Sequence, residues 1–185
     1  MKILAISGSL RAASINTALL RAVVRLAPAD ICVELYRDLG NLPLFNPDIE
    51  ATDPPVVASL RAKLVAADAV IIASPEYAHG VTGAIKNALD WMVGCEAFVN
   101  KPVALLNASS RAVHAQASLK ETITVMSGLV IEKASIALPI LGSGLDEEGM
   151  VSDRYIYGTL REAIQALQAA TVQFKTAGTS LSATT

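Results

Sequence analysis

Residues 2–16 of the chain read KILAISGSLRAASIN. The apolar first part has the length and composition of a buried strand, and Gly8 permits the sharp turn that ends it. The hydroxyls of Ser9 and Ser14, the cation of Arg11 and the free N–H groups that open the following helix together suit a bound anion, and a phosphate monoester matches them well. From this loop alone an alternative remains open, in which Ser14 only caps the helix and Arg11 is solvated.

Two better-known phosphate loops are absent from this stretch. The chain has no GxxxxGK[ST] motif, which argues against a P-loop NTPase, and no GxGxxG motif after the first strand, so the standard dinucleotide fingerprint is missing. The loop therefore favours a mononucleotide phosphate.

Beyond this stretch, apolar runs of strand length alternate with longer segments of helical period, which is typical of repeated βαβ units. Strands are predicted at residues 2–7, 32–36, 69–74, 103–107 and 130–137. Helices are predicted at residues 16–26, 55–66, 83–93, 113–126 and 154–175. Right-handed crossovers between five parallel strands predict an α/β fold with a doubly wound sheet, in the flavodoxin-like order 2-1-3-4-5.

The size and composition of the chain agree with this class. Its 185 residues suit one domain, predicted at residues 1–175, with a small, polar and flexible tail at 176–185. Hydrophobic residues make up 52% of the chain and few of them are aromatic, as expected for strands covered by helices on both faces.

Charge and cysteine content limit the partners and the compartment. The formal net charge is −2 with no dense basic run, which gives no reason to expect nucleic acid. The two cysteines are far apart and fit neither a disulfide framework nor a zinc site, and no apolar run approaches membrane-spanning length. A cytoplasmic protein without a membrane partner is predicted.

In an open doubly wound sheet, ligands bind beyond the carboxyl ends of the strands, so the loops after the third and fourth strands matter as well. Residues 74–83 read SPEYAHGVTG. Pro75 stiffens the strand exit, and Tyr77 offers a flat face among backbone amides, an arrangement suited to the edge of a ring system such as a flavin.

The loop at residues 107–116 reads NASSRAVHAQ. Ser109 and Arg111 have the hydroxyl and the cation to bond the polar edge of a flavin pyrimidine, although the loop is also a plain serine-capped helix start. His79 and His114 have no ligand set around them, so no metal site is predicted.

Three further features are interpreted structurally. The turn-rich residues 41–48 carry apolar side chains and are expected to cover an edge or to contact a partner. Lys86 and Asp90 stand four apart on a predicted helix and are expected to pair there. Trp91 is expected in the core or at a subunit contact.

Together, GSLRAASIN at residues 8–16 and PEYAHGVTGAIKNALDW at residues 75–91 resemble the NADPH-dependent FMN reductase family. This family of flavodoxin-like proteins includes bacterial FMN, quinone, azo-dye and chromate reductases. The resemblance implies that FMN is the cofactor. Its phosphate is expected to contact Ser9, Arg11, Ser14 and Asn16 and the backbone of Ile15, and its isoalloxazine is expected to lie beside Pro75, Glu76 and Tyr77.

The chain departs from the family pattern in two places. Many members have Asn and Pro where this chain has Ala78 and Thr82. Relatives also commonly carry a glycine-rich stretch where residues 109–114 here read SSRAVH, so the contacts predicted for Ser109 and Arg111 rest on their own chemistry.

The resemblance also implies the activity: hydride passes from NADPH or NADH through bound FMN to a quinone, free flavin or similar small-molecule acceptor. No catalytic side chain is predicted, because the flavin performs the chemistry and the sequence offers no convincing Ser-His-Asp set or Cys-His pair. Family members are typically homodimers or homotetramers, and the same is expected here.

Two alternatives stay open from the sequence. A flavodoxin-type FMN electron carrier would have no NAD(P)H site of its own, and the nearly balanced charge argues against it because such carriers are usually acidic. The other alternative is an α/β binding domain without flavin, against which the two matching loops argue.

Overall fold

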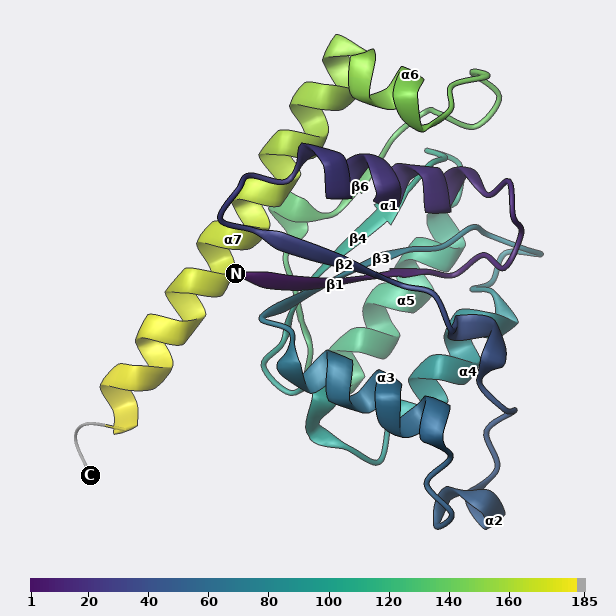
Figure 1. The fold of residues 1–185 in the computed structure, drawn as a ribbon, viewed down its shortest axis with the longest axis vertical. Coiled ribbons are helices and arrows are strands. Elements are labelled where there is room, and N and C mark those ends of the chain that lie inside the picture. The colour runs from purple at the N-terminus through teal and green to yellow at the C-terminus, as the bar shows by residue number, and fades with distance from the viewer. Residues whose placement is uncertain (183–185) are drawn as a thin grey trace.

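A computed structural model describes the backbone of residues 1–182 and the side chains of residues 1–176. Six strands form one parallel sheet (Figure 1). They are β1 (Lys2–Ser7), β2 (Cys32–Tyr36), β3 (Ala69–Ala73), β4 (Pro102–Asn107), β5 (Leu129–Val130) and β6 (Ile136–Ala137). The α-helices are α1 (Ile15–Leu26), α2 (Pro47–Glu50), α3 (Pro55–Ala66), α4 (Gly83–Met92), α5 (Val113–Val125), α6 (Glu147–Ser152) and α7 (Arg154–Ser182).

The strand order is β2-β1-β3-β4-β5, with β6 also paired to β4, and this confirms the predicted fold class and order. In the register, Ile3 of β1 lies opposite Val33 of β2 on one side and Ala69 of β3 on the other. Because all these strands run parallel, the loops after β1, β3 and β4 emerge at the same edge of the sheet.

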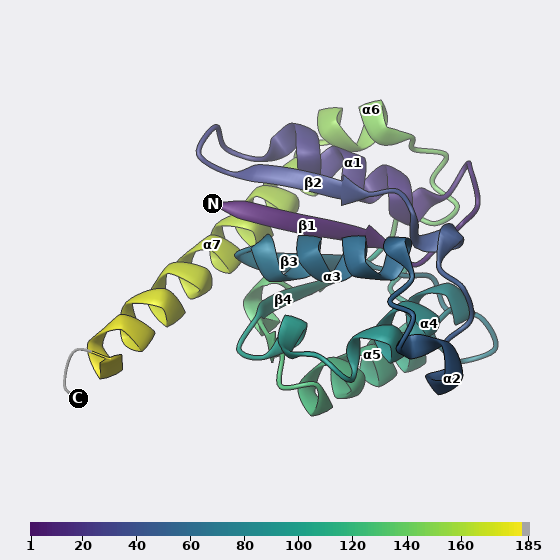
Figure 2. The ribbon, with the colours of Figure 1, turned by 60° about the horizontal axis from the view of Figure 1, so that its bottom comes forward.

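The sheet lies between two helical layers, and the central strands are apolar on both faces. Successive residues of β1 alternate between the layers, since Ile3 and Ala5 pack into one core cluster and Leu4 and Ile6 into the other. Helices α1, α6 and α7 cover the first face, and α3, α4 and α5 cover the second (Figures 1 and 2).

The strand predicted at residues 130–137 is wrong as one element. It is divided into β5 and β6 by the 3₁₀ turn Glu132–Ala134. At this break the hydroxyl of Ser135 accepts a hydrogen bond from the Leu105 N–H of β4 at 3.0 Å and donates one to the carbonyl of Ile131 at 3.0 Å. A side chain thus satisfies the backbone donor that the interrupted ladder leaves free.

The last predicted helix is longer than expected. Helix α7 continues past residue 175 to Ser182, so the backbone of the predicted tail is helical over most of its length. Residues 183–185 of that tail lie outside the described residues. Its flexibility stays a prediction, and no helix in the described part of the chain has the length and apolarity needed to cross a membrane.

The turn-rich residues 41–48 are docked onto α4. The carbonyl of Pro43 accepts hydrogen bonds from Asn87 Nδ2 at 2.9 Å and Trp91 Nε1 at 2.8 Å, and Phe45 meets Trp91 edge to face at 5.2 Å. Trp91 is therefore a core residue, as expected. Lys86 and Asp90 also pair as predicted, at 2.5 Å.

Candidate functional site

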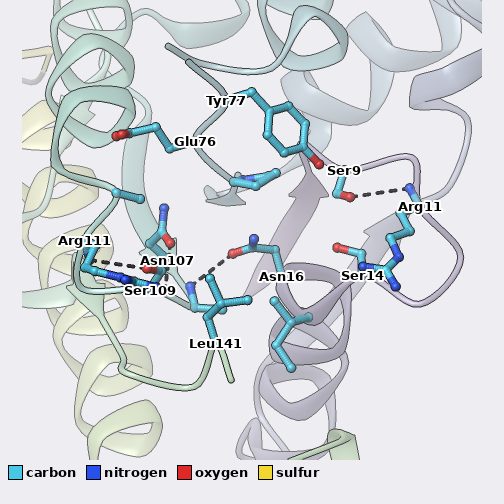
Figure 3. A pocket seen from close by; sticks show the side chains of 14 residues that line it. Ser9, Arg11, Ser14, Asn16, Glu76, Tyr77, Asn107, Ser109, Arg111 and Leu141 are labelled. Carbon is cyan, nitrogen blue, oxygen red and sulfur yellow. Dashed lines mark hydrogen bonds between the residues drawn. The ribbon is translucent and has the colours of Figure 1, made fainter. Parts of the chain in front are cut away.

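The loops after β1, β3 and β4 surround a cavity of about 350 Å³ at the carboxyl edge of the sheet (Figure 3). Its lining consists of Ser9, Arg11, Ser14, Ile15, Asn16, Pro75, Glu76, Tyr77, Asn107, Ala108, Ser109, Arg111, Ala112 and Leu141. All ten residues predicted to bind cofactor are in this set. The structure brings the residues together, and their contact with FMN stays a prediction.

The β1–α1 loop passes so closely over the end of β3 that a glycine is required. The Gly8 N–H donates to the carbonyl of Ala73 at 2.8 Å, and a Cβ built on Gly8 would lie 2.3 Å from Ser74 Oγ. No side chain fits in that space without displacing its neighbour. This close contact holds the loop so that residues after Gly8 face the cavity.

The end of this loop has both the helix cap and the groups suited to an anion, the two alternatives that the sequence left open. Ser14 is the N-cap of α1, and its Oγ accepts the Thr17 N–H at 3.2 Å, so the capping role is real. Ser14 nevertheless also lines the cavity. The Arg11 N–H donates to Ser9 Oγ at 3.4 Å, while the exposed Arg11 guanidinium makes no hydrogen bond or ion pair within residues 1–176. A cation, two hydroxyls and a helix N-terminus thus meet at one end of the cavity.

Three hydrogen bonds from side chains to backbone join the three loops. Asn16 Oδ1 accepts the Ala108 N–H at 3.1 Å, and Asn107 Nδ2 donates to the carbonyl of Ser74 at 2.8 Å. Thr82 Oγ1 donates to the carbonyl of Gly8 at 2.6 Å. All three of these side chains are buried, Asn107 with only 1% of its surface exposed. We name them the cross-loop bonds; they fix the relative positions of the cavity walls before any ligand arrives.

Asn16 therefore has a structural role in addition to its predicted contact. Its oxygen is used by Ala108, whereas its Nδ2 makes no hydrogen bond in the described part of the chain. The amide group thus keeps donors that a phosphate oxygen can accept.

Glu76 also has a structural partner that the sequence did not reveal. Its Oε2 accepts the Ala115 N–H in the first turn of α5 at 2.8 Å. The residue at the N-cap of this helix, Ala112, has no side chain able to do so. A carboxylate at a helix N-terminus is stabilising, so Glu76 caps α5 from a different loop.

Tyr77 stands at the base of a two-residue turn that exposes its ring. Tyr77 and Gly80 exchange backbone hydrogen bonds of 3.1 and 3.0 Å. Between them Ala78 and His79 both have positive φ, 49° and 60°, as in a type I′ turn, although neither is the Gly or Asn that this turn prefers. The Tyr77 side chain is 61% exposed and lies at the cavity margin (Figure 3).

The loop after β4 repeats the local arrangement of the first loop. The Arg111 N–H donates to Ser109 Oγ at 3.3 Å, and the Arg111 side chain is exposed and has no partner within residues 1–176. Arg11 and Arg111 consequently stand on opposite sides of the cavity (Figure 3). His114 stacks on His79 with ring centroids 4.3 Å apart, which adds a second contact between the Tyr77 turn and α5.

Four lining residues were not among the predicted contacts: Asn107, Ala108, Ala112 and Leu141. Asn107 is the last residue of β4 and Ala108 follows it, so the rule that placed the site at this edge could have selected them. Leu141 follows β6, and its N–H donates to the carbonyl of Ala108 at 2.8 Å. Its place depended on the divided fifth strand, which the sequence pattern did not reveal.

Known proteins resemble this chain in sequence and in fold. Residues 1–140 match the family described as NADPH-dependent FMN reductase. An NAD(P)H-dependent FMN reductase of Pseudomonas aeruginosa is 34% identical over 174 residues, covering 91% of this chain and 94% of that protein. An NADPH:quinone oxidoreductase of Arabidopsis thaliana is 32% identical over 185 residues, and the match covers 95% of this chain and 94% of the plant protein.

A solved structure is similar as well. The flavoenzyme NAD(P)H:(acceptor) oxidoreductase from Paracoccus denitrificans superimposes with a TM-score of 0.80 at 26% identity, covering 91% of this chain and 98% of that one. The shared sequence motifs, the strand order and these matches over nearly the whole length lead to one assignment: this chain belongs to the NADPH-dependent FMN reductase family.

Proposed function

We propose that the cavity at the carboxyl edge of the sheet binds FMN and that the protein uses it to pass electrons from NAD(P)H to a quinone or a free flavin. One observation supports this most strongly. Three loops from separate parts of the chain are joined by the cross-loop bonds around a single cavity, with an unpaired cation and a helix N-terminus at one end. That end suits a phosphate, and the opposite wall suits a ring.

The residues at each end fit the parts of FMN. Ser9, Arg11 and the amide of Asn16 offer donors for the phosphate monoester, and Pro75 and Tyr77 offer flat apolar surface for the isoalloxazine. Ser109 and Arg111 also line the cavity, and they offer a hydroxyl and a cation for the polar edge of the ring. A positive charge at that edge favours the reduced flavin, which carries more negative charge.

Bound FMN would supply the redox chemistry, since its ring accepts two electrons from a nicotinamide and returns them to an acceptor. The chain supplies binding, orientation and a preformed electrostatic environment. Because the Tyr77 side chain is exposed where it lines the cavity, we expect a planar donor or acceptor to approach FMN from that side.

Anaerobic mixing of the FMN-loaded protein with NADPH tests the proposal. We expect the flavin absorbance near its visible maximum to bleach and to return when a benzoquinone is added. An unbleached flavin would contradict the proposal. Bleaching without turnover on quinones and free flavins would instead identify an electron carrier, because a carrier exchanges electrons with a protein partner.

The relatives favour a quinone as the acceptor. Besides the plant enzyme, a 2-hydroxy-1,4-benzoquinone reductase of a Burkholderia species is 35% identical over 116 residues, and a quinone reductase of Escherichia coli is 29% identical over 169 residues. Steady-state rates with a benzoquinone, FMN and an azo dye, measured with both NADPH and NADH, would rank the acceptors.

The proposed state of the protein is a homodimer or homotetramer in the cytoplasm. Large apolar side chains at the surface support association, among them Leu44 at 82% and Val125 at 75% exposure. Free thiols at Cys32 and Cys95 support a reducing compartment. Light scattering of the holoprotein would give the oligomeric mass, and fractionation of cells would give the compartment.

A further inference from the structure

A second cavity, of about 250 Å³, lies beside the β1–α1 loop and shares Ser9 with the first. It is lined by Ser7, Ser9, Leu10, Thr17, Arg21, Leu35, Tyr36, Arg37 and Leu39. These residues come from the end of β1, the first turns of α1 and the end of β2. The cavity therefore lies at the same edge of the sheet as the proposed FMN site, on the side of β2.

Two arginines in this cavity carry uncompensated charge. Neither the Arg21 nor the Arg37 guanidinium makes a hydrogen bond or an ion pair within residues 1–176. By contrast, Arg25, one turn further along α1, is paired with Glu148 at 2.5 Å and Glu147 at 3.7 Å. In the described part of the chain, the two guanidiniums of this cavity are therefore available to bond an anion.

The carboxylates nearby are already engaged. Glu34 and Glu147 line an adjoining cavity together with Arg21 and Arg37. Glu34 is bonded to Lys63 and paired with Lys2 at 3.3 Å, and Glu147 is paired with Arg25. Asp38, next to Arg37 in the chain, accepts a hydrogen bond from Asn41, and within residues 1–176 no carboxylate forms an ion pair with Arg21 or Arg37.

Hydroxyl groups complete the lining. Ser7 Oγ and Thr17 Oγ1 are bonded to each other at 2.7 Å, and Ser9 stands between the two cavities. Guanidinium forks and hydroxyl donors are the groups that bind a phosphate dianion, and they match its several oxygens better than they match a single carboxylate.

We propose that this second cavity binds the 2′-phosphate of NADPH. FMN has one phosphate, which the proposed site already accommodates, so an additional phosphate must belong to a second molecule. NADPH differs from NADH by one phosphate monoester, with a charge of about −1.5 to −2 at pH 7. Arg21 lies on α1 and Arg37 directly follows β2, so two elements bring a guanidinium to this cavity, and together they can bond several oxygens of one phosphate. The inference rests on the proposed function, because it concerns the donor of that reaction.

The kinetic test compares the two donors in the double variant Arg21→Gln/Arg37→Gln. Both side chains are exposed, so the variant is expected to fold and to retain FMN. We expect KM for NADPH to rise about tenfold or more with kcat nearly unchanged, and KM for NADH to stay as it is, because only NADPH loses charge-assisted hydrogen bonds. The control is Arg154→Gln, which removes an exposed cation outside both cavities and should leave both KM values unchanged. Equal changes for both donors, or none, would overturn the proposal.

A binding test separates this inference from the proposed reaction. Calorimetry on the FMN-loaded protein would use 2′-AMP, 5′-AMP and inorganic phosphate as probes. We expect 2′-AMP to bind more tightly than the other two and its binding to be lost in the double variant. Phosphate that binds as well as 2′-AMP, or 2′-AMP binding that survives the substitutions, would contradict a nucleotide site here. Loss of bleaching by both donors with 2′-AMP binding intact would refute the proposed reaction and leave the site standing.

Discussion

Gly8 shows at the scale of one residue how the fold and the cavity depend on each other. A methyl group at this position would lie 2.3 Å from Ser74 Oγ and 2.7 Å from Ser74 Cβ. We expect Gly8→Ala to lower the free energy of unfolding by about 1–3 kcal/mol, as overpacking does, and to weaken FMN binding. Urea denaturation and FMN titration would measure the two effects.

The control for this substitution is Gly158→Ala. Gly158 lies inside α7, and a Cβ there would meet nothing within 4 Å. Alanine should therefore stabilise the protein by about 0.5–1 kcal/mol through helix propensity. Similar changes at both positions would show that the close approach at Gly8 does not matter.

Arg11 carries the charge proposed to hold the FMN phosphate. Its side chain is exposed and unpaired in the described part of the chain, so its removal should cost little stability. We expect Arg11→Ala to raise the FMN dissociation constant about tenfold or more, which corresponds to the loss of a hydrogen bond to a charged group. Arg154→Ala removes an exposed cation at the start of α7 and serves as the control. An unchanged FMN affinity would remove Arg11 from the site.

Tyr36 is a residue whose polar atom costs stability. Its hydroxyl is the one buried side-chain polar atom without a hydrogen-bond partner among the described residues. Burial, together with the charge of Asp38, raises the pKa of Tyr36 to about 12. We expect Tyr36→Phe to raise the free energy of unfolding by about 1 kcal/mol, because an unsatisfied hydroxyl is removed.

The same substitution has a pH signature. The folded pKa is above the unfolded value of about 10, so the folded state favours the neutral hydroxyl, and below pH 10 the ionisation of Tyr36 takes no stability from the fold. Stability is lost as the pH rises from about 10 to 12. Between pH 10 and 12, the free energy of unfolding, measured by urea denaturation at each pH, should fall less steeply with pH for Tyr36→Phe than for the unsubstituted protein. Identical pH slopes for the two proteins would contradict the raised pKa of Tyr36.

Thr82 connects helix α4 to the first loop, so its substitution should affect both elements. Its hydroxyl caps α4 by accepting the Ile85 N–H at 3.3 Å and donates to Gly8 of the first loop at 2.6 Å. We expect Thr82→Val to cost about 1–2 kcal/mol of stability and to weaken FMN binding as well. Thr124→Val is the control, since the Thr124 hydroxyl bonds only the carbonyl of Lys120 within α5. Loss of stability with unchanged FMN affinity would contradict a role for this bond in the cavity.

The strands and helices show how much of the fold could be predicted from the sequence. The alternation of apolar runs was sufficient to locate most strands and helices, because buried strands and amphipathic helices carry distinct periods. The strand order then followed from right-handed crossovers and the usual order of a doubly wound sheet. It was insufficient at residues 130–137, where the 3₁₀ turn Glu132–Ala134 has no turn residue such as Gly or Pro to reveal it. Both parts of the strand pair with β4, and between them the Ser135 side chain bonds Leu105 of β4, a contact made 30 residues away in the chain.

The candidate site was predictable to the same extent. Loops at the carboxyl ends of parallel strands converge by topology, so residues from three loops could be expected around one cavity. The hydrogen-bond partners of Glu76 and Thr82 could not be predicted. These partners, Ala115 and Gly8, are 39 and 74 residues away in the chain. Local patterns identify which residues face the site, whereas long-range partners depend on the packed structure.

At the scale of the whole molecule, FMN is expected to stabilise the fold by mass action. A ligand that binds only the folded state adds about 2.7 kcal/mol at 100 times its dissociation constant. Because the cavity is built from three loops, this stabilisation should raise the midpoint of a single cooperative thermal transition. Riboflavin has the same ring without the phosphate, so it should raise the midpoint much less. Equal shifts with both ligands would contradict a phosphate-binding first loop.

The cross-loop bonds have a consequence for directed evolution of this protein. In each of them the side chain of Asn16, Thr82 or Asn107 bonds a backbone atom of another loop, so substitution of any of these three residues removes a bond directly. A library that randomises positions 109–112 leaves all three bonds in place, so most of its members should stay folded, and those that still bind FMN should include variants with new acceptor preferences. A library of equal size that includes Asn16, Thr82 or Asn107 should consist mostly of inactive clones.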